Sequence, residues 1–458
     1  MTSRSHDAQP DIDSPSKHRL AGNARDLALQ VTAEIRAEWS YATDIMSRAF
    51  RVHRGLASRD RRLVAETVYG LLRMDRRLDA QVDELPPFNR GPKRTLTPMM
   101  RDQAKLLFWE LGQQIISADT AAAELKQIVG YGVPAERICD ADFGLGKKQG
   151  LEREAIRHSF PTWMLERFVE DLGEAEALKL AASMNERAPL MVMTNTRLIT
   201  REDLIARLAL EGVQAEPTAL APTGLLFRTR VNAFALPSFQ EGLFEVMDEG
   251  SQLVAEAVAP PPGGRVVDAC AGAGGKTLAL GALMQGKGRL FAMDVAGKKL
   301  EELRRRARRA GLSNVAARAV EGVQLPPEAR AEAWDRVLVD APCSGLGTLR
   351  RNPEARWRLT PSDVARFPSL QLSLLVAYAP LVAVGGRLIF ATCTVLRSEN
   401  ELVIEAFLKE RPEFVPVPLK EVMGKARAET LGDGDTLRLF PHRQGTDGFF
   451  TAVMRRVR

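Results

Sequence analysis

Cysteine is scarce in this chain, with four residues among 458, at positions 139, 270, 343 and 393. None of them lies close to another along the sequence, so we expect neither a disulfide framework nor a zinc cluster, and no metal site. Thiols without disulfide partners are typical of a reducing compartment, and we therefore expect a cytoplasmic protein.

Long apolar runs are missing as well. The longest apolar stretch extends from Leu374 to Val384 and contains Pro380, well short of the ~20 residues that a membrane span needs. The segment from Thr2 to Lys17 is mostly polar and charged, unlike a signal peptide with its apolar centre and small-residue cleavage site. We expect a soluble protein without a membrane partner.

Aromatic side chains are few, with four Tyr and five Trp, whereas the net charge is +6. This combination favours a polyanionic partner that is bound through its phosphates rather than through stacked bases. The basic residues gather in two clusters. Between Arg48 and Arg77 nine Arg face three acids, and the second cluster comprises Lys298, Lys299, Arg304, Arg305, Arg306, Arg308 and Arg309.

The length and the 45% hydrophobic content favour two or three domains. Apolar residues near Leu63 to Leu78 recur with a helical period, with Ser58 and Asp60 as N-cap candidates and breaks at Pro86-Pro87, Gly91-Pro92 and Gly130 to Pro134. The expected divisions are a disordered tail at 1–19, a helical domain at 20–141, a linker at 142–159, a small α+β domain at 160–245, with a helix around 202–212, and a catalytic domain at 246–458.

Strands and helices alternate regularly from Pro260 onward, which predicts an α/β fold with a mostly parallel, doubly wound sheet. The expected strands are 265–268, 289–294, 336–340, 387–391 and 449–454, with helices at 277–284 and 298–310. Asp268, Asp294 and Asp340 each close a strand, and Cys343 and Cys393 closely follow one. Because ligands bind at the carboxyl rim of such sheets, we expect covalent chemistry there.

A glycine-rich loop follows the first of these strands, between Asp268 and Thr277. Such a loop offers backbone N–H groups to a ligand. A nucleoside-triphosphate P-loop is disfavoured because it needs glycine where Cys270 stands. S-adenosylmethionine fits better, with Asp294 placed to bind its ribose. The expected cofactor-binding residues of the loop are Cys270, Ala271, Gly272, Ala273, Gly274, Gly275 and Lys276, and Lys276 either binds cofactor or neutralises nearby carboxylates.

Several motifs carry a resemblance to a known family. They are Asp268 to Thr277, Asp340-Ala341-Pro342-Cys343-Ser344-Gly345 with its continuation Thr348 to Glu354, Ala391-Thr392-Cys393-Thr394, Glu399-Asn400-Glu401, and Asp447-Gly448-Phe449-Phe450. Together they resemble the Nop/Sun family of RNA cytosine-5 methyltransferases, whose catalytic domain is Rossmann-like. The segments Ser58 to Arg61 and Tyr69 to Arg73 resemble the NusB-like RNA-binding module of the bacterial member that modifies small-subunit (16S-type) ribosomal RNA.

The resemblance implies roles for the residues at the rim. Cys393 would attack carbon-6 of a flipped-out cytosine, Cys343 would assist release of the product, and Asp340 would hydrogen-bond the cytosine edge and contact the cofactor. DNA cytosine-5 methyltransferases resemble the chain in the Pro-Cys block but use that cysteine as nucleophile, so Thr392-Cys393 favours RNA. We expect a monomer, with no metal.

Some positions depart from the family pattern. Ala273 stands where Pro is common, Glu321 is the acid nearest the expected adenine contact, and Met193-Thr194-Asn195 lacks the usual Arg. We expect RNA contacts from Arg59, Arg61, Arg62, Arg350 and Arg351. A catalytically inactive RNA-binding assembly factor and the same chemistry on transfer RNA are alternatives, although two thiols at one rim have no use in an inactive protein.

Overall fold

The computed structural model describes residues 18–85, 96–331 and 333–458. The chain forms two compact units: unit 1 comprises residues up to Arg187 together with Leu349–Pro361, and unit 2 comprises Ala188–Thr348 and Ser362–Arg458. The predicted tail up to residue 17 and the predicted breaks at Pro86-Pro87 and Gly91-Pro92 lie outside the described residues.

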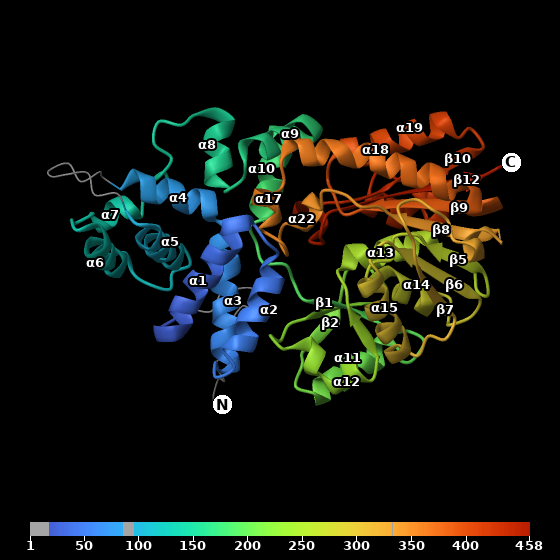
Figure 1. The fold of residues 1–458 in the computed structure, drawn as a ribbon, viewed down its shortest axis with the longest axis horizontal. Helices are drawn as coiled ribbons and strands as arrows, with labels where there is room; N and C mark the ends of the chain where they lie inside the picture. The colour runs from blue at the N-terminus through green and yellow to red at the C-terminus, as the bar shows by residue number, and fades with distance from the viewer. Residues whose placement is uncertain (1–17, 86–95, 332) are drawn as a thin grey trace, which may run out of the picture. The chain divides into compact units, whose positions relative to one another are not determined.

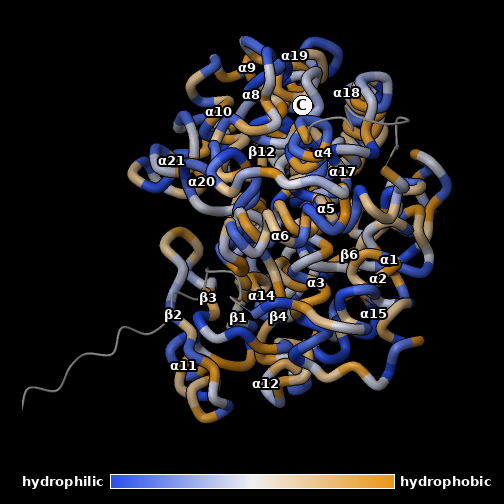
Figure 2. Tube along the Cα trace, turned by 90° about the vertical axis from the view of Figure 1, so that its left-hand side faces the viewer, coloured by the Kyte–Doolittle hydropathy of each residue, from blue (hydrophilic) through white to orange (hydrophobic). Residues whose placement is uncertain are grey.

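The described part of unit 1 is helical, as its periodicity predicts, and Figure 2 shows hydrophobic and hydrophilic residues alternating along its helices. Its apolar faces pack in two clusters, one around Val64 and Val68, the other around Leu106 and Leu107. The helices are α1 (Gly22–Glu38), α2 (Ala42–Val52), α3 (Ser58–Arg73), α4 (Asp75–Glu84), α5 (Pro98–Gly112), α6 (Ala118–Val129), α7 (Ala135–Ile138), α8 (Gly150–Arg157), α9 (Thr162–Leu172), α10 (Glu174–Ser183) and α17 (Ala355–Arg358).

The predicted N-cap of the helix near Ser58 is wrong. Helix α3 begins at Ser58 itself, after Ala57, and no side chain caps it. The expected linker contains helix α8, whose Ala155 and Ile156 are buried. Gly144 in that stretch has φ +87°, and a Cβ on it would lie 2.7 Å from the Gln81 backbone nitrogen. The glycines here therefore permit tight turns and close packing rather than flexibility.

Helices α9 and α10 group with unit 1, although we expected them in the small α+β domain. The two units divide the chain after Arg187, whereas the boundaries expected from the sequence remain predictions.

A short segment that interrupts unit 2 in the sequence, Leu349–Pro361, also belongs to unit 1. Its Arg356 is fully buried and donates to the carbonyls of Arg73 and Ser159, at 3.2 and 3.0 Å, and to Asn185 Oδ1 at 2.8 Å. Its guanidinium also lies over the Phe160 ring, 4.1 Å from the centroid. Since no carboxylate accepts from Arg356 in these bonds, backbone and amide oxygens and the ring stabilise its charge within the fold.

Unit 2 contains two sheets. The smaller one is antiparallel, with strand order β2-β3-β1-β4, and packs its apolar side against α11 around Val192, Leu204 and Phe244. Its elements are β1 (Met191–Thr194), α11 (Arg201–Leu210), β2 (Ala215–Pro217), β3 (Gly224–Phe227), η1 (Ala233–Ala235), α12 (Pro237–Gln240) and β4 (Phe244–Val246). The predicted mixture of short strands with a helix near 202–212 is confirmed.

The larger sheet has the order β10-β12-β9-β8-β5-β6-β7, with β11 paired to β12. Strands β7, β6, β5, β8 and β9 are parallel, whereas β12 joins β9 and β10 antiparallel. Its elements are α13 (Glu249–Val258), β5 (Arg265–Asp268), α14 (Gly275–Leu283), β6 (Arg289–Asp294), α15 (Gly297–Arg309), β7 (Val315–Ala319), α16 (Pro327–Arg330), β8 (Trp334–Asp340), η2 (Leu346–Thr348), α18 (Pro361–Tyr378), η3 (Ala379–Leu381), β9 (Val382–Thr392), η4 (Arg397–Glu399), α19 (Glu401–Glu410), β10 (Phe414–Val417), α20 (Leu419–Met423), α21 (Lys425–Leu431), β11 (Leu437–Leu439), α22 (Pro441–Gln444) and β12 (Phe449–Arg456).

Helices cover both faces of this sheet, as the strand–helix alternation predicts. Leu375 of α18 and Phe407 of α19 pack with Val337 and Phe390 on one face. Helices α13 and α14 pack on the other face, and Figure 1 shows α18 and α19 on the opposite side of the strands from α13 and α14. This is a Rossmann-like architecture, and it brings the carboxyl ends of β5, β6, β8 and β9 to one rim.

The burial of Arg356 generates the first prediction. In Arg356→Met the apolar stem is kept, but the accepting carbonyls of Arg73 and Ser159 lose their donor. Because buried polar groups left unpaired cost ~1–3 kcal/mol each, we expect the free energy of unfolding to fall by about 3 kcal/mol. Urea denaturation followed by circular dichroism measures this. Arg358→Met is the control: Arg358 is exposed over the Tyr41 ring and should change stability by less than about 1 kcal/mol.

Candidate active site

The predicted rim of carboxylates is confirmed. Asp268, Asp294 and Asp340 are the last residues of β5, β6 and β8. The loop after β8 carries Cys343, and Cys393 directly follows β9. Parallel pairing of β8 with β9 places Asp340 opposite Ala391, so the two cysteine-bearing loops leave the sheet side by side.

The two thiols face each other, with 3.4 Å between Cys343 Sγ and Cys393 Sγ. The hydrogen bond to Cys393, burial and neighbouring negative charge raise the pKa of Cys343 well above its ordinary value. The protonated thiol form of Cys343 is thus favoured, and either sulfur can donate in the hydrogen bond between them.

A buried carboxylate, Glu399, joins the two thiol loops. It accepts from the Ser344 backbone N–H at 2.8 Å, from Ser344 Oγ at 2.6 Å and from Thr394 Oγ1 at 3.0 Å. Gln371 Nε2 of α18 adds a contact at 3.4 Å. Ser344 follows Cys343 and Thr394 follows Cys393, so one carboxylate fixes the residue after each sulfur. Burial raises the pKa of Glu399, and these donors oppose the rise.

Two glycines allow a third segment to join these loops. Gly347 donates its N–H to the Cys393 carbonyl at 2.9 Å, and Gly448 donates to the Gly347 carbonyl at 2.8 Å. A Cβ on Gly347 would lie 2.1 Å from the Gly448 carbonyl oxygen, so only glycine fits.

Lys276 and Asp340 form an ion pair beside the thiols, with 2.6 Å between Nζ and Oδ2. Burial lowers the pKa of Lys276, but the Asp340 carboxylate outweighs it and the net pKa is raised. The ammonium also interacts electrostatically with Cys393 and lies 5.3 Å from the Phe449 ring centroid. Lys276 therefore neutralises a carboxylate, one of the two roles that its sequence position allows.

The glycine-rich loop surrounds Asp294. Asp294 Oδ2 accepts the Gly272 N–H at 2.8 Å, and its Oδ1 accepts the Ala296 N–H at 2.7 Å. Gly272 has φ +54°, and no atom lies within 4 Å of a Cβ built on Gly272 or Gly275. The backbone of the loop thus borders open space at these two glycines, and a ligand can approach it closely there.

Other predicted cofactor residues differ in their surroundings. Cys270 is half-buried, and burial strongly raises its pKa, so it behaves as a packing residue. Ala271 packs with Leu300 and Leu303 of α15. Glu321 is exposed just beyond β7.

Asp268 lies deeper than the other rim carboxylates and is fully buried. Its Oδ2 accepts the Thr277 hydroxyl at 2.7 Å, a partner that sequence reasoning missed. Burial raises the pKa of Asp268 to about 7, against the effect of the Thr277 hydrogen bond. Asp268 therefore braces the strand end and the start of α14 and lies beneath the surface that a ligand would meet.

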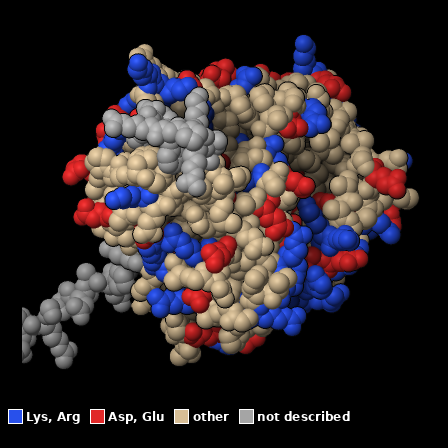
Figure 3. Space-filling view, turned by 60° about the vertical axis from the view of Figure 1, so that its left-hand side comes forward, with Lys and Arg blue, Asp and Glu red and all other residues tan. Residues whose placement is uncertain are grey.

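The predicted RNA-contact residues separate into two groups. Arg59 and Arg62 are exposed on α3. Arg61 instead closes its own loop, donating to the carbonyls of Leu56 and Arg54. Arg350 is 4% exposed, and this burial disfavours the predicted contact with a surface phosphate. Arg351 is half-buried. Figure 3 shows Lys and Arg side chains gathered on the visible face, with acids between them.

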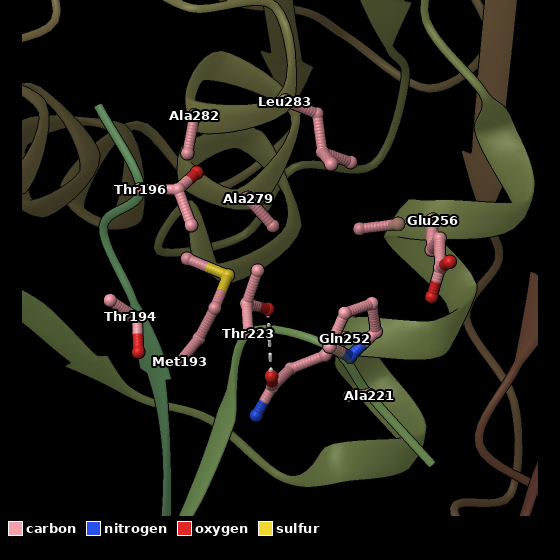
Figure 4. A pocket seen from close by; sticks show the side chains of 12 residues that line it. Met193, Thr194, Thr196, Ala221, Thr223, Gln252, Glu256, Ala279, Ala282 and Leu283 are labelled. Carbon is pink, nitrogen blue, oxygen red and sulfur yellow. Dashed lines mark hydrogen bonds between the residues drawn. The ribbon is translucent and has the colours of Figure 1, made fainter. Parts of the chain in front are cut away.

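A small pocket lies elsewhere in unit 2, between β1, α13 and α14. Figure 4 shows the hydrogen bond that crosses it, from Thr223 Oγ1 to Gln252 Oε1 at 3.3 Å. The lining is largely apolar and includes none of the rim residues described above. Across residues 18–85, 96–331 and 333–458, no group of His, Cys, Asp and Glu could hold a metal ion, and no helix is long and apolar enough to cross a membrane.

The buried Asp268 generates a pH-dependent prediction. Its pKa of about 7 exceeds the ordinary 3.8, so its contribution to stability is present below pH ~4 and lost as the pH rises through 7. In Asp268→Asn this loss disappears. The stability of the variant relative to the wild type should therefore increase between pH 4 and pH 8, by on the order of a few kcal/mol.

Urea unfolding at several pH values measures this difference. The exposed Glu410→Gln provides the control and should track the wild type. A constant difference for Asp268→Asn across the range would contradict the assignment.

Known proteins resemble this chain over most of its length. The model of the family described as 16S rRNA methyltransferase RsmB/F matches residues 255–455, and an RsmF/B-like ferredoxin-like domain matches residues 160–233. The probable ribosomal RNA small subunit methyltransferase B of Synechocystis sp. is 32% identical, covering 95% of this chain and all of that protein. Its counterpart in Bacillus subtilis is 30% identical, covering 95% and 99%.

Solved structures extend the likeness. The crystal structure of PH0851 is 27% identical and superposes with a TM-score of 0.75, covering 96% of this chain and 100% of that one. A methyltransferase homolog protein from Pyrococcus horikoshii is 29% identical with a TM-score of 0.57, covering 67% and 98%. Relatives that match over nearly their whole length confirm the resemblance drawn from the motifs: the chain belongs to the RsmB/F family of 16S rRNA methyltransferases.

Proposed function

We propose that this protein transfers a methyl group from S-adenosylmethionine to carbon-5 of a cytosine in small-subunit ribosomal RNA. The observation that carries the proposal is the pair of thiols 3.4 Å apart at the rim. Two sulfurs at that spacing can both reach one pyrimidine ring, and the names of the relatives supply the substrate class.

The chain offers a fitting place for the cofactor. Gly272 and Gly275 leave open space above the loop, and Asp294 holds the loop from beneath while ending β6, where an acid can reach a ribose. We propose Gly272 to Gly275, Asp294 and Glu321 as its binding residues. When bound there, S-adenosylmethionine supplies the methyl group as an electrophilic sulfonium.

Cys393 is the proposed nucleophile. Its sulfur forms a bond to carbon-6, and the electrons of the 5,6 double bond then make carbon-5 nucleophilic. Asp340 is positioned by Lys276 to accept from the cytosine edge. The target base must leave its stack to reach this rim.

Cys343 is the proposed release residue. After carbon-5 has gained the methyl group, its proton must leave and the bond from Cys393 to carbon-6 must break, which restores the 5,6 double bond. Water at the rim can accept the carbon-5 proton, and the Cys343 thiol, 3.4 Å from Cys393, can give its own proton to the departing sulfur and so assist the elimination.

Unit 1 is the proposed RNA-binding module of NusB-like type. Its described residues are helical, and α3 exposes Arg59 and Arg62. A basic helix face can bind a phosphate backbone without reading bases. Arg351, on the segment Leu349–Pro361 after the Pro-Cys loop, is proposed as a further contact.

The two cysteines give the decisive prediction. Cys393→Ala should lose methylation while RNA binding remains, because the covalent step has no nucleophile. Cys343→Ala should accumulate a covalent RNA adduct, visible as a slower band on a denaturing gel. Transfer of labelled methyl groups to small-subunit ribosomal RNA measures activity. Undiminished activity in Cys393→Ala would refute the assignment, as would product release by Cys343→Ala with no adduct.

The basic face of α3 gives a separate prediction. The double variant Arg59→Ala/Arg62→Ala should bind a ribosomal RNA fragment more weakly at low salt. Each lost phosphate contact should flatten the plot of log affinity against log salt by ~0.7–0.9. Fluorescence anisotropy between 50 and 300 mM KCl measures this. Arg167→Ala, an equally exposed Arg on α9 that pairs with Glu170, should keep the wild-type slope. An unchanged slope in the double variant would exclude these contacts.

A further inference from the structure

Helix α15 presents two different basic faces. Lys298, Lys299 and Arg308 are exposed, whereas Arg306 and Arg309, three positions apart, share a half-buried face. The basic cluster therefore does not form one continuous surface patch, and Arg306 and Arg309 contact other residues of unit 2.

Arg306 joins two parts of unit 2. Its Nη1 donates to the Ala273 carbonyl at 2.8 Å, within the glycine-rich loop, and its Nη2 donates to Glu245 Oε2 at 3.0 Å, on strand β4 of the small sheet. One planar guanidinium thus bridges the proposed cofactor loop and the antiparallel sheet, a geometry that a lysine cannot reproduce.

Glu245 is held firmly in place. It is 3% exposed and pairs with both Arg306 and Arg309, and Arg309 lies over the Phe239 ring, 3.7 Å from its centroid. A buried carboxylate that moved away from its cations would leave unpaired charge, which is strongly unfavourable. Glu245 therefore anchors Arg306.

A second tie keeps the small sheet and α15 together. Asn195, directly after β1, donates from Nδ2 to the carbonyls of Gly242 and Ala310, at 2.9 and 3.0 Å. A Cβ on Gly242 would lie 2.0 Å from the Arg309 carbonyl oxygen. The end of α15 and the turn before β4 are thus in direct backbone contact, so Glu245 and the helix that carries Arg306 are packed against each other.

The cofactor loop depends on such support. Ala273 lies between Gly272 and Gly274, which have φ of +54° and +90°, and neither glycine restricts its own backbone. Ala273 also lacks the fixed φ of proline. Two bonds hold the Ala273–Gly274 peptide: its N–H donates to the Ala271 carbonyl at 2.9 Å within the loop, and its carbonyl accepts from Arg306. The bond from Arg306 is therefore the one that ties this peptide to a helix outside the loop.

We propose that Arg306 is a positioning residue for cofactor binding, and that Glu245 of the small sheet holds it in the bridging geometry. This inference rests on the proposed function, because it assumes that the loop from Gly272 to Gly275 binds S-adenosylmethionine. Arg306 contacts neither reacting atom. It holds the loop in its binding conformation before the cofactor arrives, which lowers the conformational cost of binding.

The test compares Arg306→Met with Arg305→Met, in the full-length protein. Arg305 is the neighbouring exposed residue and pairs with Glu302 on the same helix. Isothermal titration with S-adenosylhomocysteine should show binding weakened about tenfold or more in Arg306→Met and unchanged in Arg305→Met. The KM for S-adenosylmethionine should rise in the same variant, while its RNA affinity stays at the wild-type value.

Arg306→Lys guards against a folding defect. It keeps the charge beside Glu245 but cannot bridge both oxygens, so its S-adenosylhomocysteine affinity should lie between those of Arg306→Met and the wild type. Wild-type affinity in both folded Arg306 variants would overturn the inference. Failure of the wild type itself to bind S-adenosylhomocysteine would instead overturn the proposed function and this inference with it, so the two failures are distinguishable.

Discussion

The candidate site depends on one buried carboxylate. Glu399 accepts hydrogen bonds from Ser344 and Thr394, the residues that follow the two cysteines, and thereby fixes two loops that leave the sheet from different strands. A loop carrying an isolated thiol could place its sulfur over a range of several ångströms. Because Glu399 is shared, the two sulfurs are located relative to each other by a network of short bonds rather than by loop stiffness.

The electrostatics of the rim follow from the same crowding. Three carboxylates end neighbouring strands, and each is stabilised by different surroundings. Asp340 pairs with Lys276, Asp294 accepts two backbone N–H groups, and Asp268 is buried with a raised pKa. Of these, Asp340 and Asp294 are half-buried and can still meet a ligand, whereas Asp268 serves the fold. Similar sequence positions thus lead to different chemistry through burial alone.

Much of the catalytic domain could be predicted from the sequence because its signals are local. The strands ending at Asp268, Asp294 and Asp340 are short apolar runs that close on an acid, and parallel strands bring such ends to one rim. Contacts between distant segments could not be read in this way. The burial of Arg356 and Arg350 depends on a segment that packs with unit 1, and nothing in its composition distinguishes it from a surface loop. The bridging role of Arg306 was likewise hidden within a run of similar charges.

The hydrogen bonds of Glu399 could be predicted from the sequence only in part. Glu399 and Asn400 stand just after the Thr-Cys motif, which could have suggested a local role, yet the partner loop lies 55 residues away in the sequence. Family resemblance identified the segment without saying what its acid does. A buried acid can be recognised from sequence only when its donors are also known, and these come from three separate elements.

The antiparallel strand β12 has a consequence for the order of folding. It lies between β9 and β10, pairs along β9 up to Thr392, and brings Gly448 against Gly347. The ribosome makes this strand more than fifty residues after Cys393, so β9 lacks its β12 neighbour during that part of synthesis and forms an edge of the sheet. The backbone contact between Gly347 and Gly448 therefore forms only after the ribosome has already made both thiol loops and Glu399.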